Sequence, residues 1–264
     1  TDFCELLRSY GVGITMSGGE TADVGDLVNT LIVDSTFFVR MKRSDVIDCD
    51  NIRPGDVIVG LSSFGKAVYE KNYNAGMGSN GLTAARHLLL SHEYAAKYPE
   101  TYSNTIDDSK VYCGKYKVSD ILPGTDVTVV DAILSPTRTY APVIREILDK
   151  NRAAVHGMIH CTGGGQAKCK NFGRGIHYIK DNLFDVPPLF AAIAENSDIS
   201  EREMYQDFNM GHRMEIYCSE ADAEFMIETA AKYGVEAKIV GRAEKSVDEF
   251  NHVTIKANGK VFEY

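Results

Sequence analysis

The feature that most constrains this chain is an apolar run that ends in three glycines, Met158-Ile159-His160-Cys161-Thr162-Gly163-Gly164-Gly165. Residues 153–159 predict a strand, and the polar residues 166–170 permit a helix start. Glycines lack a Cβ and allow backbone N–H groups to converge on an anion. A strand, a glycine-rich turn and a helix start together favour a phosphate site, although a turn that only reverses the chain has the same composition.

Three further corners combine glycine with short polar residues: Gly18-Gly19-Glu20-Thr21, Ser79-Asn80-Gly81 and Phe208-Asn209-Met210-Gly211. One such corner is weak support for a ligand site, because turns of this composition occur in most proteins. Four of them together favour phosphate binding. The sequence contains neither the phosphate-loop motif nor the dinucleotide glycine motif, and neither the helical zinc motif nor the serine-hydrolase motif.

Periodicity predicts an α+β fold, because strands and helices alternate irregularly. Residues 1–52 are interpreted as the C-terminal part of an N-terminal α/β sandwich domain, and residues 53–264 as a complete C-terminal domain with helices packed on a mixed sheet. Residues 93–118 predict a loop with a short helix. We expect strands over 12–16, 27–41, 57–61, 125–134, 153–159, 214–218 and 235–241, and helices near 3–9, 82–89, 137–148, 200–206 and 219–233. Another helix is expected to start at residues 186–190, and the chain is expected to end in a hairpin.

The net charge of −9 argues against a nucleic-acid partner, which needs a basic face. It also means that a bound anion needs local backbone donors and a few cationic groups, or Mg²⁺. The six cysteines are scattered without a C-x-x-C pair, so we expect reduced thiols and a cytoplasmic protein. Cys161 and Cys169 could be redox-active or nucleophilic, but we expect them to be buried or half-buried thiols. No apolar run reaches the length of a membrane span.

In their order along the chain, several segments resemble the aminoimidazole ribonucleotide synthetase family, the phosphoribosylformylglycinamidine cyclo-ligases of purine synthesis. LSPTRTY and HCTGGG are the most specific of these segments. The similar stretches are GGETAD (18–23), RPGDVIVGLSS (53–63), SNG (79–81), LSPTRTYAPVIREIL (134–148), VHGMIHCTGGG (155–165), VPPLF (186–190), FNMGHRMEI (208–216) and Gly241-Arg242.

The resemblance implies a two-domain α+β subunit, a homodimer, and the use of ATP with Mg²⁺. The implied reaction closes the ring of formylglycinamidine ribonucleotide to give aminoimidazole ribonucleotide. ATP would phosphorylate the formyl oxygen, an amidine nitrogen would attack that carbon, and phosphate would leave. Such chemistry depends on charge stabilisation and on close positioning of the reacting groups.

The resemblance also implies roles for particular residues. Gly18, Gly19, Glu20 and Thr21 would lie near the nucleotide, with Glu20 at the metal. The substrate or its phosphate would be held by Ser79, Asn80, Gly81, Thr162, Gly163, Gly164 and Gly165.

Three single residues complete the set, each with a structural alternative. His160 would polarise a group or handle a proton, or would be a buried structural histidine. Asn209 would orient the substrate or cap its turn, and Arg138 would pair with a phosphate or lie solvated at a helix start. The ligase hypothesis requires residues 79–81, 162–165 and 209 to share one cleft.

The chain departs from the family pattern in two places. The leading glycine motif that contacts ATP is absent, so we expect a fragment that starts inside the N-terminal domain. Gly78 stands where relatives usually carry a histidine before Ser-Asn-Gly. Two other hypotheses therefore remain: a sister ATP-using enzyme of the formylglycinamidine ribonucleotide synthetase, selenophosphate synthetase, thiamine monophosphate kinase or hydrogenase-maturation type, or a non-catalytic module that binds a nucleotide or ribotide.

Overall fold

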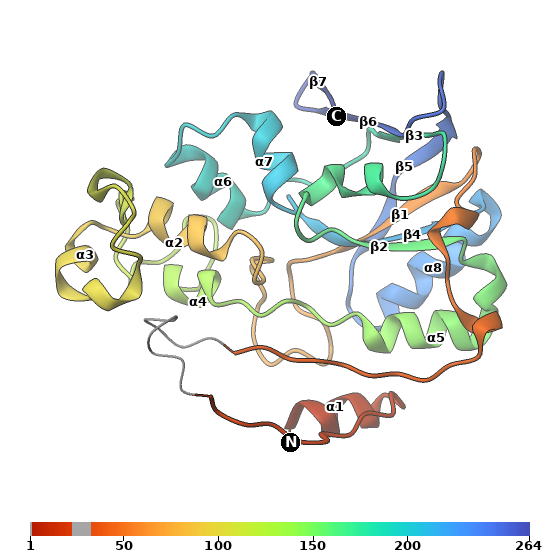
Figure 1. Ribbon diagram of the computed structural model, residues 1–264, viewed down its shortest axis with the longest axis horizontal. Coiled ribbons are helices and arrows are strands. Elements are labelled where there is room, and N and C mark those ends of the chain that lie inside the picture. Colours follow the sequence, from red (N-terminus) through yellow and green to blue (C-terminus); the bar gives the residue numbers. More distant parts are fainter. Residues whose placement is uncertain (1, 23–32) are drawn as a thin grey trace.

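The computed structural model describes residues 2–22 and 33–264 (Figure 1). Within these residues one mixed sheet of 7 strands has the order β2-β4-β1-β5-β3-β6-β7. All neighbouring strands are antiparallel except β3 and β6. The α+β prediction is confirmed. The strands are β1 Val57–Ser62, β2 Gly157–His160, β3 Ile176–Lys180, β4 His212–Cys218, β5 Ala237–Lys245, β6 His252–Ala257 and β7 Lys260–Glu263.

β1 lies at the centre of the sheet, between β4 and β5, and is buried along its whole length. Its side chains alternate between two hydrophobic clusters, as the period of two in a strand requires. Val57, Val59 and Leu61 belong to one cluster, and Ile58 belongs to the other. A strand buried on both faces accounts for the continuous apolar run of this segment.

Helices cover both faces of the sheet (Figure 1). The face that carries Val59 packs against α5, Ala141–Asn151, and α8, Glu220–Lys232. The cluster on the other face contains side chains of α2 Leu82–Leu89, α4 Val129–Ile133, α6 Pro188–Glu195 and α7 Glu201–Asp207. The remaining helices are α1 Asp2–Ser9 and α3 Glu93–Lys97, with short 3₁₀ turns at 43–45, 49–51, 99–101, 108–110, 152–154 and 165–171.

Local sequence signals explain several element boundaries. Pro142 lies in the first turn of α5, where a missing N–H costs least. Ser200 and Glu203 form a reciprocal capping box at the start of α7. Asn258 and Gly259 both have positive φ, which suits the tight turn of the β6–β7 hairpin. The helices predicted near 137–148 and 200–206 and the final hairpin are confirmed.

Other predicted elements are wrong. Residues 125–134 hold the helix α4 rather than a strand, because the Thr128 side chain caps it by accepting a hydrogen bond from the Asp131 N–H. β2 starts only at Gly157, after a 3₁₀ turn. Residues 12–16 and 33–41 form no strand, and the rest of the strand expected over 27–41, residues 27–32, lies outside the described residues. A strand needs a neighbour to pair its backbone groups, and the described part of residues 2–52 supplies none.

Residues 93–118 are mostly irregular, as expected. They close over a small cluster of their own, formed by Ala95, Val111 and Tyr112. At the N-terminal end, Tyr10 after α1 packs its ring against Tyr69 and Tyr233. Among the described residues, no helix has the length and apolar character needed to cross a membrane.

Candidate functional site

The structure brings three of the four glycine corners together. The Asn80 side chain amide donates to the Thr162 carbonyl at 3.3 Å and to the Asp207 carbonyl at 2.9 Å. One amide thus links the start of α2, the turn after β2 and the end of α7. Asn209 lies just beyond that helix, so residues 79–81, 162–165 and 209 belong to one region of the molecule.

Gly165 sets how closely the turn after β2 approaches the end of α7. Its φ is +49°, and a Cβ there would lie 2.5 Å from the Tyr205 carbonyl oxygen and 2.6 Å from the Phe208 carbonyl oxygen. Because these atoms are backbone, a side chain could be accommodated only if one of the two corners moved. Gly163 differs, because the nearest atom to its Cβ position is the Asn80 Oδ1 at 3.7 Å.

Asn209 is 4% exposed, and its side chain shapes the corner that it occupies. Its Oδ1 accepts a hydrogen bond from the Ser63 hydroxyl at 2.6 Å, and its Nδ2 donates to the Gly76 carbonyl at 2.9 Å. The Gln166 amide donates to the Asn209 carbonyl and to the His212 carbonyl. These contacts match the turn-capping alternative, and a direct contact between Asn209 and a substrate stays a prediction.

Arg213, a residue that the sequence interpretation missed, lies beneath the Ser79 corner. It is buried, and its guanidinium donates to the Gly76 carbonyl at 2.9 Å and to the Thr137 hydroxyl at 3.2 Å. The same hydroxyl accepts from the Ser79 N–H at 3.3 Å. A Cβ on Gly78 would lie 1.8 Å from the Arg213 Nη1, so only glycine fits above this cation. The one available signal was an arginine two residues after the Phe208–Gly211 corner.

His160 is held in its neutral form at the end of β2. Burial, followed by the positive charges of Arg213 and Lys168, lowers the pKa of this imidazole to about 4. Its Nε2 is buried and has no hydrogen-bond partner among the described residues. The Lys168 ammonium donates to the Thr162 hydroxyl at 2.5 Å. Two cations therefore lie close to the glycine turn of a chain whose net charge is −9.

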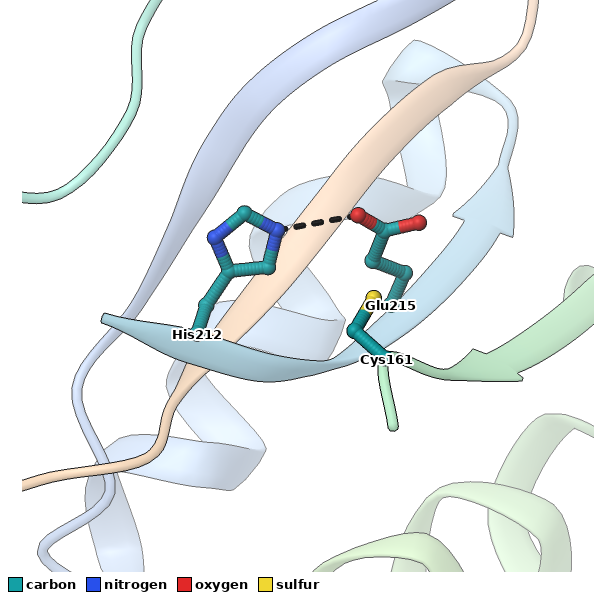
Figure 2. A group of neighbouring side chains, drawn as sticks. All are labelled: Cys161, His212 and Glu215. Atoms are coloured by element: carbon teal, nitrogen blue, oxygen red, sulfur yellow. Dashed lines mark hydrogen bonds and ion pairs between the residues drawn. The ribbon is translucent and has the colours of Figure 1, made fainter. Parts of the chain in front are cut away.

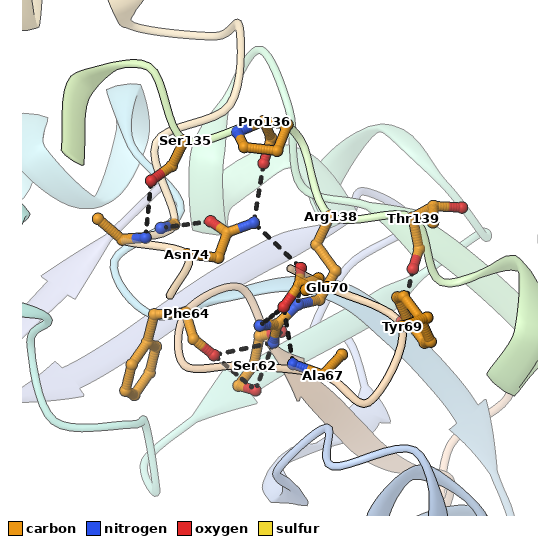
Figure 3. Close-up of polar contacts among 12 residues, drawn as sticks. Ser62, Phe64, Ala67, Tyr69, Glu70, Asn74, Ser135, Pro136, Arg138 and Thr139 are labelled. Atoms are coloured by element: carbon orange, nitrogen blue, oxygen red, sulfur yellow. Dashed lines mark hydrogen bonds and ion pairs between the residues drawn. The ribbon is translucent and has the colours of Figure 1, made fainter. Parts of the chain in front are cut away.

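Arg138 occupies a different environment from the one predicted (Figure 3). It is 3% exposed and forms a bidentate ion pair with Glu70, with N···O distances of 2.9 and 2.7 Å. Its Nη1 also donates to the carbonyls of Ser62 and Phe64. Burial raises the pKa of Glu70, but the hydrogen bonds from Arg138, the Ala67 N–H and Asn74, together with the charge of Arg138, outweigh that effect and lower the pKa overall. This geometry favours a structural role for Arg138 over phosphate binding.

A buried polar cluster around Lys180 and Glu215 contacts Gln166, the residue that follows the glycine turn. The Lys180 ammonium donates to Glu215, to the Gln166 carbonyl at 2.6 Å and to the Gln166 side chain at 3.2 Å. Glu215 also accepts hydrogen bonds from His212 at 2.9 Å and from the Tyr217 hydroxyl at 2.6 Å. Burial raises the pKa of Glu215, but the charge of Lys180, the hydrogen bond and charge of His212 and the hydrogen bond from Lys180 together outweigh this effect. They lower the pKa to about 2, so the carboxylate is ionised.

Cys161, His212 and Glu215 are the group of described residues whose donor atoms lie close enough to suggest a metal, within 4.8 Å of one another (Figure 2). The Lys180 ammonium forms an ion pair with the Glu215 carboxylate, so the negative charge that would attract a metal ion is already compensated by a side chain. Burial raises the pKa of the Cys161 thiol well above its usual value, which opposes thiolate ligation. The cysteine is thus a buried thiol, as expected.

The fourth glycine corner does not join the other three. Residues 18–21 are exposed in an irregular segment, and no atom lies within 4 Å of the Cβ positions of Gly18 and Gly19. The predicted nucleotide contacts of Glu20 and Thr21 therefore have no counterpart in the described geometry. The role of Glu20 as a Mg²⁺ ligand stays a prediction, because this ion is usually held by one or two carboxylates together with waters and phosphates.

Two cavities border the convergent corners. The smaller has a volume of about 260 Å³ and is lined by Asn80, Gly81, Ala84, Gly163, Gly164, Ile199, Asp207 and Phe208. The larger has a volume of about 680 Å³ and lies between α1 and the segments 69–74 and 136–139. Thr137 lines the larger cavity and also accepts a hydrogen bond from Arg213, so the Arg213 guanidinium lies at the edge of this cavity.

Comparison with known proteins gives a consistent family match. Residues 53–253 match the family described as "AIR synthase related protein, C-terminal domain". The chain is 31% identical over 252 residues to a phosphoribosylformylglycinamidine cyclo-ligase of Methanococcus vannielii, covering 94% of this chain and 62% of that protein. It is 35% identical over 238 residues to the protein of the same name from Methanopyrus kandleri, covering 88% and 58%. The chain thus spans about three fifths of the length of these curated relatives.

Solved structures show weaker likeness. PurL of Thermotoga maritima, solved in complex with FGAR, is 16% identical with a TM-score of 0.43, over 84% of this chain and 29% of that one. The thiamine-monophosphate kinase of Stenotrophomonas maltophilia is 14% identical with a TM-score of 0.41, over 81% and 54%.

Proposed function

Because the chain belongs to the family of AIR synthase related proteins, C-terminal domain, we propose that it serves the ATP-dependent cyclisation of formylglycinamidine ribonucleotide to aminoimidazole ribonucleotide. The names of its relatives support this reaction. The observation that carries the proposal is the convergence of residues 79–81, 162–165 and 209 in one region with Arg213 and Lys168 beside it. Residues 1–52 would belong to a nucleotide-binding and dimerisation domain, and residues 53–264 to the substrate domain.

The ribose phosphate of the substrate would lie at the glycine turn after β2, where the Lys168 ammonium and the Arg213 guanidinium provide positive charge. The Lys168 ammonium and the Thr162 hydroxyl lie together at the glycine turn, and the Arg213 guanidinium lies under Gly78. Backbone N–H groups of a glycine turn and a lysine ammonium are typical phosphate ligands. Arg213 is buried and fixed by carbonyls, so it would contribute mainly through its charge and by holding Thr137 and Ser79 in place.

His160 would polarise a reacting group as a neutral imidazole. A base whose pKa is about 4 removes protons poorly at neutral pH, so proton abstraction is the weaker of the two predicted roles. A neutral ring nitrogen can instead donate or accept one hydrogen bond without a charge change. Its unpartnered Nε2 is the atom available for that bond.

ATP would be the phosphoryl donor, with Mg²⁺ on its phosphates. The described residues do not form that part of the site, because Gly18, Gly19, Glu20 and Thr21 are exposed and apart from the other corners. This separation favours a second candidate function, in which the chain binds the ribotide but does not turn it over.

One experiment tests both candidates. The chain is titrated with formylglycinamidine ribonucleotide by calorimetry, and then incubated with the same compound, ATP and Mg²⁺ while ADP and product are measured. Binding with turnover supports the ligase, and binding without turnover supports the ribotide-binding module. Lys168→Met should weaken binding about tenfold or more, whereas Lys150→Met, an exposed lysine of α5, should not. A folded chain that does not bind the ribotide contradicts both.

A further inference from the structure

The smaller cavity has one ionisable lining residue, Asp207, in the part of the chain that the structure describes. The rest of the lining consists of glycines, an amide and the apolar side chains of Ala84, Ile199 and Phe208. Asp207 is the last residue of α7, where the helix dipole also favours a cation. An anionic group placed here would be repelled, and a cationic group would be attracted.

The Asp207 carboxylate is free to bind a ligand. Within residues 2–22 and 33–264 it forms no hydrogen bond or ion pair through its side chain, although its backbone carbonyl accepts from Asn80. Partial burial raises the pKa of this carboxyl, and the neighbouring charge of Glu203 adds to that effect. Both effects reflect a carboxylate without a compensating cation.

The glycine turn therefore has a positive charge on one side, from Lys168, and a negative charge on the other, from Asp207. Thr162, at the start of the turn, contacts the Lys168 ammonium, while Gly163 and Gly164 line the cavity that carries Asp207. A ligand that lies along this turn would present an anionic group to Lys168 and a cationic or N–H-rich group to Asp207. Formylglycinamidine ribonucleotide has both, a phosphate and an amidine.

We propose that Asp207 is a specificity-determining residue whose carboxylate binds the protonated amidine of the substrate. The inference rests on the function proposed above and assigns one part of the ligand to one side chain. An amidinium has two coplanar N–H donors, and a carboxylate pairs with such a group through two parallel hydrogen bonds, as it does with arginine. The corresponding amide has a carbonyl oxygen at one of these positions, which a carboxylate repels.

The test compares two ligands that differ only at this group. Formylglycinamidine ribonucleotide has the amidine, and formylglycinamide ribonucleotide has an amide in its place, with the same ribose phosphate. The wild-type chain should bind the amidine more tightly by calorimetry. Asp207→Asn should weaken amidine binding about 10-fold to 100-fold and change amide binding less than about twofold. Asp207→Glu should restore part of the preference.

Asp198→Asn is the matched control, because it removes the same charge from an exposed residue near α7 that does not line the cavity. It should leave both affinities unchanged. Equal binding of the two ligands by wild type, or an equal loss of both in Asp207→Asn, overturns the role of Asp207 while the proposed function stands. If the folded wild-type chain binds neither ligand, the proposed function fails, and this inference fails with it.

Discussion

At the scale of single residues, the environment of His160 decides what it can do. The sequence alone shows a histidine shortly before three glycines, and this pattern is compatible with either a charged or a neutral imidazole ring. Burial comes first among the effects that lower its pKa to about 4, and Arg213 and Lys168 come next. Arg213 is 53 positions away in sequence, and it reaches the site only because β4 pairs with β2.

The depressed pKa of His160 predicts a pH dependence of stability. The folded-state pKa is about 4 and the ordinary value is 6.5, so between these values the unfolded chain binds a proton that the folded chain does not. The free energy of unfolding should therefore fall as the pH drops from 6.5 towards 4. His160→Asn should flatten this dependence relative to wild type, as measured by urea denaturation at several pH values.

His92→Asn, at a more exposed histidine of the irregular segment, is the control for that measurement. NMR titration of the His160 ring provides an independent check. A midpoint near 6.5 in the wild-type chain would contradict the electrostatic description of the site.

At the scale of elements, the contact between the glycine turn and the end of α7 predicts unequal effects of substitution at two glycines of that turn, Gly163 and Gly165. Gly165→Ala should lower the free energy of unfolding by about 2–3 kcal/mol, because its Cβ would collide with backbone carbonyls at positive φ. Gly163→Ala should stay within about 0.5 kcal/mol of wild type, since its Cβ position is open. Chemical denaturation measures both, and equal losses would show that the turn does not have this conformation.

The buried ion pair that joins β3 to β4 predicts a second effect at this scale. Lys180→Met should lower the free energy of unfolding by about 3–5 kcal/mol, because Glu215 is left charged and buried. The double variant Lys180→Met/Glu215→Gln should be less destabilised than the single variant, since no isolated charge remains. Lys150→Met, in an exposed pair of α5, should change stability by less than about 1 kcal/mol. A double variant less stable than the single one would contradict this assignment.

Local patterns in the sequence were sufficient for the features that depend on neighbouring residues. The short helix over 200–206, the hairpin turn at Asn258 and Gly259 and the buried strand over 57–61 were all predicted correctly. The roles of Lys180 and Glu215 could not be predicted, because their pairing depends on how the whole sheet orders its strands, with β1 and β5 lying between β4 and β3. Arg138 shows the same limit, since its partner Glu70 lies 68 positions away in sequence.

At the scale of the whole molecule, residues 33–41 present apolar side chains to solvent. Phe37, Phe38 and Val39 are 72%, 92% and 81% exposed. Contiguous exposed apolar residues mark interaction surfaces. We expect the chain to self-associate in sedimentation velocity experiments, and Phe37→Ser/Phe38→Ser to shift it towards monomer. Phe250→Ser, at an isolated exposed phenylalanine, is the control, and a wild-type chain that is fully monomeric would contradict the prediction.

The central position of β1 has a consequence for how the protein is made. Val57 pairs with Cys218 on one side and with Arg242 on the other, so the middle of the sheet joins the first quarter of the chain to the last. During synthesis on the ribosome, β1 emerges long before either partner exists. The apolar side chains of β1 therefore remain unpaired while more than half of the chain is translated. We expect folding to be slow and largely post-translational, and to depend on chaperones that shield this segment.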